Sequence, residues 1–259
     1  MTHPALRQAE HELAVYRRIW RGSVATMFVT PLLFLAAMGL GLGDSIDRGA
    51  RGQATLGGVS YLAFLAPGLL AATAMQVGAG ASLWPVQGGF SWQRFFHASA
   101  ATPLRPVDIL LGWLISIVAR SLLAAVLFLA VATAFGIVAS PLAVLAVPAA
   151  ALTSLAFAAP LTAFTATREG DTAFPMIMRF VVVPLFLFSG AFFPISQLPA
   201  ALRAVAWFTP LWHGVALCRS LMLGTLEAGP GLGHLAVLVA SSAAGVAWGA
   251  RTFTRRLNA

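Results

Sequence analysis

The chain has 259 residues, of which 59% are hydrophobic and only 9% are charged. A soluble domain of this length does not need so apolar a composition, so we predict an all-α, polytopic membrane protein. The formal net charge is +8, and all sixteen basic residues are arginine. Because a Walker-type phosphate-binding loop needs a lysine, the composition excludes ATP binding of that kind.

The arginines flank apolar stretches and form no basic face, so they are interpreted as signals of membrane topology, and no nucleic-acid partner is expected. The single cysteine, Cys218, excludes an internal disulfide and a thiolate metal cluster. No part of the chain has the composition of a separate soluble domain. Residues 1–259 are therefore predicted to form a single transmembrane domain.

Residues 1–23 are polar, carry several arginines and place apolar side chains at roughly helical spacing. This pattern predicts an amphipathic helix that lies in the headgroup region of a membrane. A cleavable signal peptide is the alternative, but the charged part is far longer than the usual start of such a peptide. We expect the segment to be retained.

Six apolar stretches are predicted to span the membrane, over about residues 24–42, 59–83, 109–135, 142–167, 173–193 and 234–250. Six crossings put both termini on one side, together with the loops 84–108 and 168–171. That side then holds Arg7, Arg17, Arg18, Arg21, Arg94, Arg105, Arg168, Arg251, Arg255 and Arg256, whereas the other side holds Arg48, Arg51, Arg203 and Arg219. The positive-inside rule therefore places both termini in the cytosol.

The connection from Trp84 to Asp108 is the longest polar interruption between the first four spans. Within it, residues 90–99 are predicted to form a short helix, preceded by a Gly-Gly pair and followed by two prolines. An ordinary interfacial helix is one interpretation. A docking element for a cytosolic partner is the other, because aromatic residues and arginine are typical interface anchors.

Arg120 lies within the third span, about 17 Å from its cytosolic end and close to the midplane of a hydrocarbon core roughly 30 Å thick. None of the six spans has an acidic residue near that depth. An intramembrane arginine is costly and is a candidate functional residue. The alternative is a structural arginine that donates hydrogen bonds to carbonyl groups or water inside the bundle.

Residues 194–233 are too interrupted to cross a membrane. Two amphipathic half-helices are predicted, over about residues 198–208 and 211–223. The break falls at Thr209-Pro210, because proline cannot donate a backbone hydrogen bond and clashes with the preceding turn. Each half-helix rises only about 15 to 20 Å, so both are predicted to enter the membrane from the outer face and return as a gate or shield.

Several segments resemble the permease subunits of type-2 ATP-binding-cassette (ABC) exporters, especially the branch of the nodulation lipo-oligosaccharide exporter and daunorubicin-resistance permeases. The most specific are LFSGAFFP at 187–194, QLP at 197–199 and TPL at 209–211. Weaker matches are GVSY at 58–61, FLAPG at 64–68, and TPLR at 102–105 with Asp108. Together they cover nearly the whole chain.

The resemblance implies an amphipathic N-terminal helix, six spans, a coupling helix that docks on the ATPase subunit, and a re-entrant helical hairpin between spans five and six. Carried over to this sequence, the coupling helix contains Phe90, Trp92, Gln93, Arg94, Phe95 and Phe96. The outer gate and hairpin contain Phe192, Phe193, Pro194, Thr209, Pro210, Trp212 and His213. Arg120 lies on the substrate path, where members of this branch often carry a basic residue.

The function that the resemblance implies is export, by two permease protomers and two separate ATPase subunits that bind ATP and Mg²⁺. The second protomer is either another copy or a sibling permease. This chain itself is expected to have no catalytic residue, metal or cofactor. Its apolar helices with one buried arginine favour an amphipathic substrate such as a drug, a glycolipid or a lipo-oligosaccharide. The expected location is the bacterial inner (plasma) membrane.

An intramembrane hydrolase is the alternative from another class, because Ser189-Gly190 ends a span and is followed by His213 and His234. However, residue 187 is Leu where six-span serine proteases carry Gly, and neither histidine falls inside a span, so no base is placed near the serine. A channel or a non-transporting scaffold is the third interpretation. A channel needs a continuous polar lining, which the spans do not show.

Overall fold

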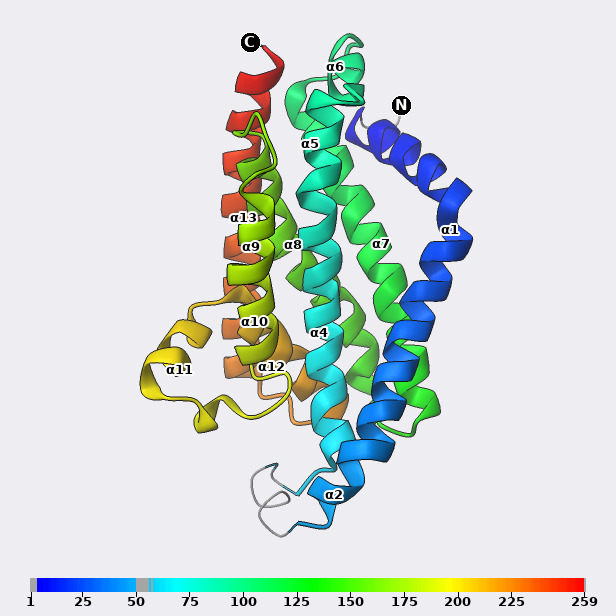
Figure 1. The fold of residues 1–259 in the computed structure, drawn as a ribbon, viewed down its shortest axis with the longest axis vertical. Helices are drawn as coiled ribbons and strands as arrows, with labels where there is room; N and C mark the ends of the chain where they lie inside the picture. Colours follow the sequence, from blue (N-terminus) through cyan, green and yellow to red (C-terminus); the bar gives the residue numbers. More distant parts are fainter. Residues whose placement is uncertain (1–3, 50–55, 57, 259) are drawn as a thin grey trace.

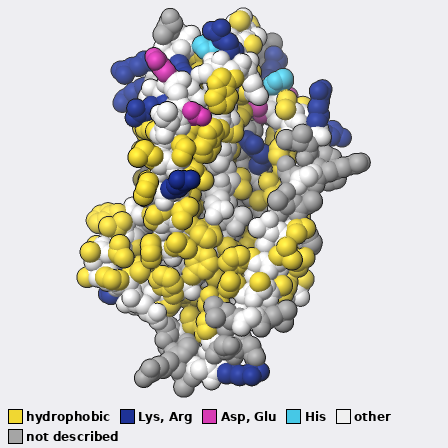
Figure 2. Space-filling view, in the orientation of Figure 1, with side chains coloured by type: hydrophobic (Ala, Val, Ile, Leu, Met, Phe, Trp, Pro, Cys, Tyr) yellow, Lys and Arg dark blue, Asp and Glu magenta, His cyan; other side chains and the backbone are white. Residues whose placement is uncertain are grey.

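Helices make up all the regular secondary structure in the computed structural model, which describes residues 4–49, 56 and 58–258. Figure 1 shows the long helices running roughly side by side, with both chain termini at one end, called here the termini end. Many of the charged side chains visible in Figure 2 gather at that end, beyond a broad hydrophobic belt. The prediction of an all-α protein is confirmed for the described residues.

Among the described residues, four helical stretches are long and apolar enough to cross a membrane: Tyr61–Ser91, Pro106–Ala134, Pro141–Thr165 and Ala228–Leu257. They correspond to the predicted second, third, fourth and sixth spans. The stretch at the predicted fifth span, Phe174–Phe188, is shorter and rises about 22 Å.

The N-terminal segment and the predicted first span form one continuous helix, α1 (Pro4–Ala37), followed by a π-helical turn, η1 (Met38–Gly43), and α2 (Asp44–Asp47). The predicted division near residue 23 into an interface helix and a first span therefore does not coincide with a break in the helix. The N-terminal part of α1 is inclined to the rest (Figure 1) and packs with α7 (Pro106–Ala134).

The region predicted as one helix over residues 90–99 is split. Helix α4 (Tyr61–Ser82) is followed by α5 (Trp84–Ser91), and the chain then turns through Arg94, with a left-handed φ of 54°, into α6 (Phe95–Ala100). The Gly-Gly pair lies inside α5 rather than before a helix. The reason is packing, since a Cβ atom added at Gly89 would lie 2.6 Å from ring atoms of Phe95 and Phe96.

Helix α7 begins directly after the TPLR motif at residues 102–105. Pro106 occupies the first turn, where its missing N–H costs nothing, and a carboxylate oxygen of Asp108 accepts a hydrogen bond from the backbone N–H of Arg105 at 3.2 Å. After α7, a short 3₁₀ helix, η2 (Pro141–Leu145), leads into α8 (Ala146–Thr165).

The fifth stretch consists of α9 (Phe174–Ile177), a π-helical turn, η3 (Met178–Val182), and α10 (Val183–Phe188). A 3₁₀ turn, η4 (Ile195–Gln197), then leads to the predicted pair of half-helices, α11 (Ala200–Trp207) and α12 (Pro210–Leu223). The predicted break at Thr209 is confirmed, because this residue is extended, with φ −90° and ψ 135°.

The last helix, α13 (Ala228–Leu257), is longer at both ends than the predicted sixth span. Residues 229–233, which the prediction leaves outside the sixth span, are helical. Pro230 lies in the first turn, where a missing N–H is tolerated. A Cβ atom at Gly231 would lie 2.9 Å from Leu226, so the glycine allows the preceding loop to pack closely.

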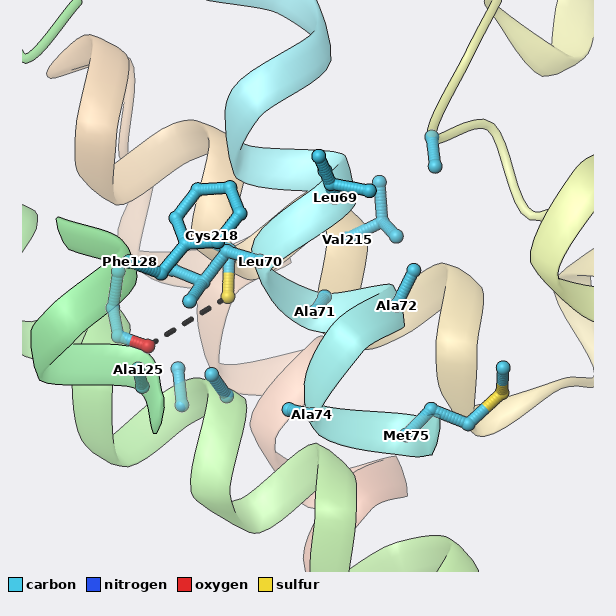
Figure 3. Close-up of a cluster of buried hydrophobic side chains, with 14 of the residues drawn as sticks. Leu69, Leu70, Ala71, Ala72, Ala74, Met75, Ala125, Phe128, Val215 and Cys218 are labelled. Atoms are coloured by element: carbon cyan, nitrogen blue, oxygen red, sulfur yellow. Dashed lines mark hydrogen bonds between the residues drawn. The ribbon is translucent and has the colours of Figure 1, made fainter. Parts of the chain in front are cut away.

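Helix α8 packs against α4, α7, α12 and α13. A small residue permits close approach of α4 and α8, because a Cβ atom at Gly78 would lie 2.5 Å from the carbonyl oxygen of Ser154. The Ser154 hydroxyl also accepts a hydrogen bond from Ser121 of α7 at 2.7 Å. Figure 3 shows the apolar part of the core, where side chains of α4 such as Leu70 lie beside Phe128 of α7 and Cys218 of α12.

Candidate coupling segment, charged pocket and outer hairpin

The residues predicted to form the coupling helix divide into a buried and an exposed group. Phe90 and Phe96 are only 3% and 0% exposed, and their rings contact Phe253 of α13 at 5.0 and 5.3 Å. Phe95 is half-buried and lies 5.7 Å from the ring of Trp113. These three aromatic residues therefore fix α6 to the bundle, and Phe90 and Phe96 are not available to a partner.

The turn between α5 and α6 carries the exposed group. Trp92 is 64% exposed, and Gln93 and Arg94 are exposed as well. Of the six residues predicted to contact the ATPase, these three face outward, and we call residues 92–94 the coupling turn. A large exposed aromatic side chain next to an arginine is the usual composition of an interface anchor.

Polar contacts that sequence reasoning missed hold α5 in place. The Gln87 side-chain amide donates to the carbonyl oxygen of Glu169 at 2.7 Å and to the Ser91 hydroxyl at 2.9 Å. Arg256 lies 4.2 Å from the ring centre of Phe90 and donates to the carbonyl oxygen of Thr165 at 2.9 Å. The signal for Arg256 was its position in a basic C-terminal stretch, which we had interpreted only as a topology signal.

Arg120 lines a pocket of about 640 Å³ near the termini end of the bundle. The lining residues are His11, Glu12, Val15, Tyr16, Trp84, Pro85, Gly88, Trp92, Gln93, Phe95, Trp113 and Arg120. The guanidinium carbon lies 5.6 Å from the ring centre of Tyr16 and 5.7 Å from that of Trp113. Its Nε and one Nη donate long hydrogen bonds, of 3.3 and 3.4 Å, to the carbonyl oxygen and hydroxyl of Ser116.

The acidic residue whose charge acts on Arg120 is Glu12, which lies on α1 and not in a predicted span. Glu12 lines the same pocket, and its charge interacts with that of Arg120. Burial raises the pKa of Glu12, while the charges of His11 and Arg120 and a hydrogen bond from Gln8 act in the opposite direction. Glu12 lies outside the six predicted spans, in the segment predicted for the headgroup region, so the sequence gives no signal that it pairs with Arg120.

At the opposite end, Arg219 of α12 joins three segments that the sequence motifs had singled out separately. Its guanidinium donates to the carbonyl oxygen of Phe64 at 3.2 and 3.3 Å and to that of Gly190 at 2.8 Å, and it lies 3.9 Å from the Phe64 ring centre. A Cβ atom at Gly68 would lie 2.6 Å from Cα of Ala191. The FLAPG, FSGA and α12 segments therefore meet at one point. Sequence reasoning missed Arg219, although an arginine in an apolar half-helix was the available signal.

The residues predicted to form the outer gate fall into two contact groups. The Phe192 ring contacts those of Phe34 on α1 and Phe186 on α10, at 6.1 and 5.1 Å. The Trp212 ring instead contacts the rings of His213 and His234, with ring centres 4.8 and 5.1 Å away. Phe193 and Pro194 are partly buried, as are Phe192, Trp212 and His213. The Thr209 hydroxyl donates to the carbonyl oxygen of Ala206 at 2.7 Å, and α12 begins at the next residue, Pro210.

The geometry does not assemble a serine hydrolase. Ser189 is 1% exposed, and its hydroxyl donates to the carbonyl oxygen of Phe186 at 3.5 Å. His213 and His234 contact each other, with 2.9 Å between their Nδ1 atoms, and Nε2 of His213 lies 3.0 Å from the carbonyl oxygen of Trp207. The two histidines are therefore engaged with partners other than the serine. In the described part of the chain, no group of three His, Cys, Asp or Glu residues is arranged to hold a metal ion.

Comparison with known proteins identifies the family. Residues 9–223 match the family described as ABC-2 type transporter. Nodulation protein J of Rhizobium leguminosarum bv. trifolii is 35% identical over 219 residues, which cover 82% of this chain and 81% of that protein. Nodulation protein J of Rhizobium meliloti (strain 1021) is 31% identical over 220 residues, covering 82% and 81%.

In transporters of this type, the membrane subunit carries no cofactor and pairs with an ABC subunit that binds and hydrolyses ATP. The match covers α1 to α12 and so includes the coupling turn, the charged pocket and the outer hairpin. This chain therefore belongs to the ABC-2 type transporter family, as a multi-pass membrane permease and not as the ATP-hydrolysing subunit.

Proposed function

We propose that this permease exports an amphipathic molecule from the cytosol or the inner leaflet to the outer face of the bacterial inner membrane, driven by its ATPase partner. The observation that carries the proposal is the position of the Arg120 pocket, which shares Trp92 and Gln93 with the coupling turn. A movement imposed on that turn by an ATPase therefore changes the walls of a pocket that has one cationic and several aromatic side chains. A drug, a glycolipid or a lipo-oligosaccharide has the matching chemistry.

The proposed topology has six crossings: the part of α1 from about residue 24 onward with η1, α4 with α5, α7, η2 with α8, α9 to α10, and α13. Residues 4–23 of α1 form the interface helix in this scheme. Both termini are cytosolic in this scheme, and the pair α11 and α12 forms the re-entrant outer hairpin. The common position of the termini and α6 at one end supports an even number of crossings (Figure 1). The fifth crossing is the shortest, and its π-helical turn lies in its middle.

The proposed assembly has two permease protomers, identical or sibling, and two ATPases. The fifth stretch has an exposed apolar surface, since Met176 and Phe180 are 62% and 73% exposed. This surface supports a contact with protein or lipid. In a two-fold assembly such a surface either faces the second protomer or contacts lipid. Substrate leaves past the turn with Phe192 and Phe193 and past the outer hairpin.

The proposal is tested by purifying the tagged chain from native membranes, identifying the ATPase that co-purifies, and measuring ATP hydrolysis in reconstituted vesicles. Replacing both Trp92 and Arg94 with Ala should lower substrate-stimulated hydrolysis by about tenfold or more, because an interface loses its central anchors. Trp248→Ala is the matched control, since Trp248 is 42% exposed on α13 and away from the turn. Full substrate stimulation of ATP hydrolysis in the double variant would contradict the coupling role of the turn. Recovery of the chain without any ATPase would contradict the proposal that it is part of an ATP-driven exporter.

A further inference from the structure

Trp113 of α7 has an indole N–H that is buried and unused. The side chain is 5% exposed and lines the Arg120 pocket, and its Nε1 atom has no hydrogen-bond partner among the described residues. A buried donor without an acceptor costs about 1 to 3 kcal/mol, and buried polar groups in native proteins are nearly always paired. An acceptor that occupies the pocket would remove this cost.

The guanidinium of Arg120 also has unused capacity. It carries five N–H donors, and its two hydrogen bonds, both to Ser116, are longer than the usual range of about 2.7–3.2 Å. Trp113 lies about two turns earlier on the same helix, and its ring is 5.7 Å from the guanidinium carbon. The two donors therefore lie beside one cavity, and together they suit an anionic acceptor.

The remaining walls of the pocket are largely aromatic. Tyr16 comes from α1, Trp84 from the start of α5, Trp92 from the coupling turn and Phe95 from α6. The volume of about 640 Å³ lies within the usual range for sites that bind small molecules. A charge with an attached apolar chain fits this lining better than a fully hydrated ion does.

We propose that this pocket binds the anionic head group of an amphipathic molecule, with Arg120 and Trp113 as donors and Glu12 as a competing anion that the head group displaces. The proposal that the pocket binds a head group is argued from the pocket geometry. Its role in export rests on the proposed function. Glu12 keeps the charge of Arg120 compensated while the pocket is empty, which lowers the cost of an intramembrane cation. The head group of a lipid and free phosphate share the required chemistry.

The test measures binding of dihexanoyl phosphatidylglycerol to the full-length permease in phosphatidylcholine nanodiscs by isothermal titration calorimetry, with empty nanodiscs as the blank. Arg120→Gln should weaken binding by about tenfold or more, since a charged donor is lost, and Trp113→Phe by about three- to tenfold, since one N–H is lost. Arg120→Lys should retain part of the affinity, because it keeps the charge but loses the planar fork. Glu12→Gln should tighten binding severalfold.

Arg179→Gln and Trp248→Phe are the matched controls, because neither residue lines the pocket. Unchanged affinity in both Arg120→Gln and Trp113→Phe overturns the proposal. Equal binding of dihexanoyl phosphatidylcholine overturns the anionic head group, and displacement of the lipid by inorganic phosphate at an equal concentration overturns the amphipathic ligand. Because binding is measured without ATP, a permease that binds the lipid but does not export disproves the proposed function alone, and one that exports without binding disproves only the pocket.

Discussion

At the scale of single residues, Arg219 links several segments at the end of the bundle opposite the termini end. It satisfies two backbone carbonyl groups from different segments and stacks on the Phe64 ring, and no carboxylate is among these partners. Gly214, five residues earlier on α12, lies against the Thr153 side chain so closely that an added Cβ atom would overlap it, so α12 packs tightly on α8. Arg219 thus holds the outer hairpin against α4.

Arg219→Met should destabilise the permease by about 2 to 4 kcal/mol, because two carbonyl groups lose a charged donor in an apolar setting. The measurement is thermal unfolding in detergent, compared with Arg179→Met, an arginine without those contacts. Equal melting temperatures for the two variants would show that the Arg219 hydrogen bonds do not stabilise the fold.

Ser189→Ala should leave export unchanged and lower stability by no more than about 1 kcal/mol. The hydroxyl makes one long hydrogen bond and has no histidine as a partner. Transport and turnover of the native substrate are the readouts. Complete loss of activity, with the protein still folded, would restore the hydrolase interpretation.

Glu12 makes head-group binding depend on pH. Its pKa is raised chiefly by burial, so it takes up a proton at a higher pH than an ordinary glutamate, and the competing negative charge then disappears. Affinity for dihexanoyl phosphatidylglycerol should therefore increase as pH falls through that raised pKa. His11, Tyr16 and Arg120 are the other titratable residues that line the pocket. Because His11 also gains positive charge on acidification, His11→Gln should keep the dependence and Glu12→Gln should lose it.

At the scale of elements, Gly89 sets the position of α6. An added Cβ atom would overlap the rings of Phe95 and Phe96, and both rings are held from the far side by Trp113. Gly89→Ala should destabilise the termini end by about 1 to 3 kcal/mol through overpacking and should reduce stimulated ATP hydrolysis. Gly80→Ala is the matched control, because nothing lies within 4 Å of a Cβ atom there. Equal ATPase stimulation in the two variants would contradict this role for Gly89.

The sequence predicted the existence of the elements better than their ends. Continuous apolar stretches and Thr209-Pro210 predict α4, α7, α8 and the break between α11 and α12, because hydropathy and the missing proline N–H act locally. The division of residues 90–99 depends on the packing of Gly89 against Phe95 and Phe96. The helical start of α13 depends on the packing of Gly231 against Leu226. Such contacts are set by tertiary packing, which a single sequence does not reveal.

The candidate site was predicted in part for the same reason. Arg120 is recognisable by its charge in an apolar stretch. Glu12 and Trp113 are not, because an acidic residue on an amphipathic helix and a tryptophan in a span are both ordinary in sequence. Their importance follows from the inclination of α1 toward α7, which brings segments about a hundred residues apart to one pocket (Figure 1).

At the scale of the whole molecule, the proposed topology can be tested by labelling. Cys218 is fully buried, so the native thiol should react poorly with a membrane-impermeant maleimide. In intact spheroplasts, Glu227→Cys, before α13, should be labelled, whereas Arg255→Cys, near its end, should react only after the membrane is opened. Both positions are exposed. Labelling of position 255 in intact spheroplasts would contradict cytosolic termini.

Because α1 is one continuous helix, it connects the charged pocket directly to the turn that contains Phe192. Glu12 faces the charged pocket, and Phe34 on the same helix touches Phe192 of the outer turn. The two residues are separated by about 33 Å along one helix, whose N-terminal part is inclined to the rest (Figure 1). We expect a displacement of Glu12 to reach the turn that contains Phe192 through the backbone of this helix.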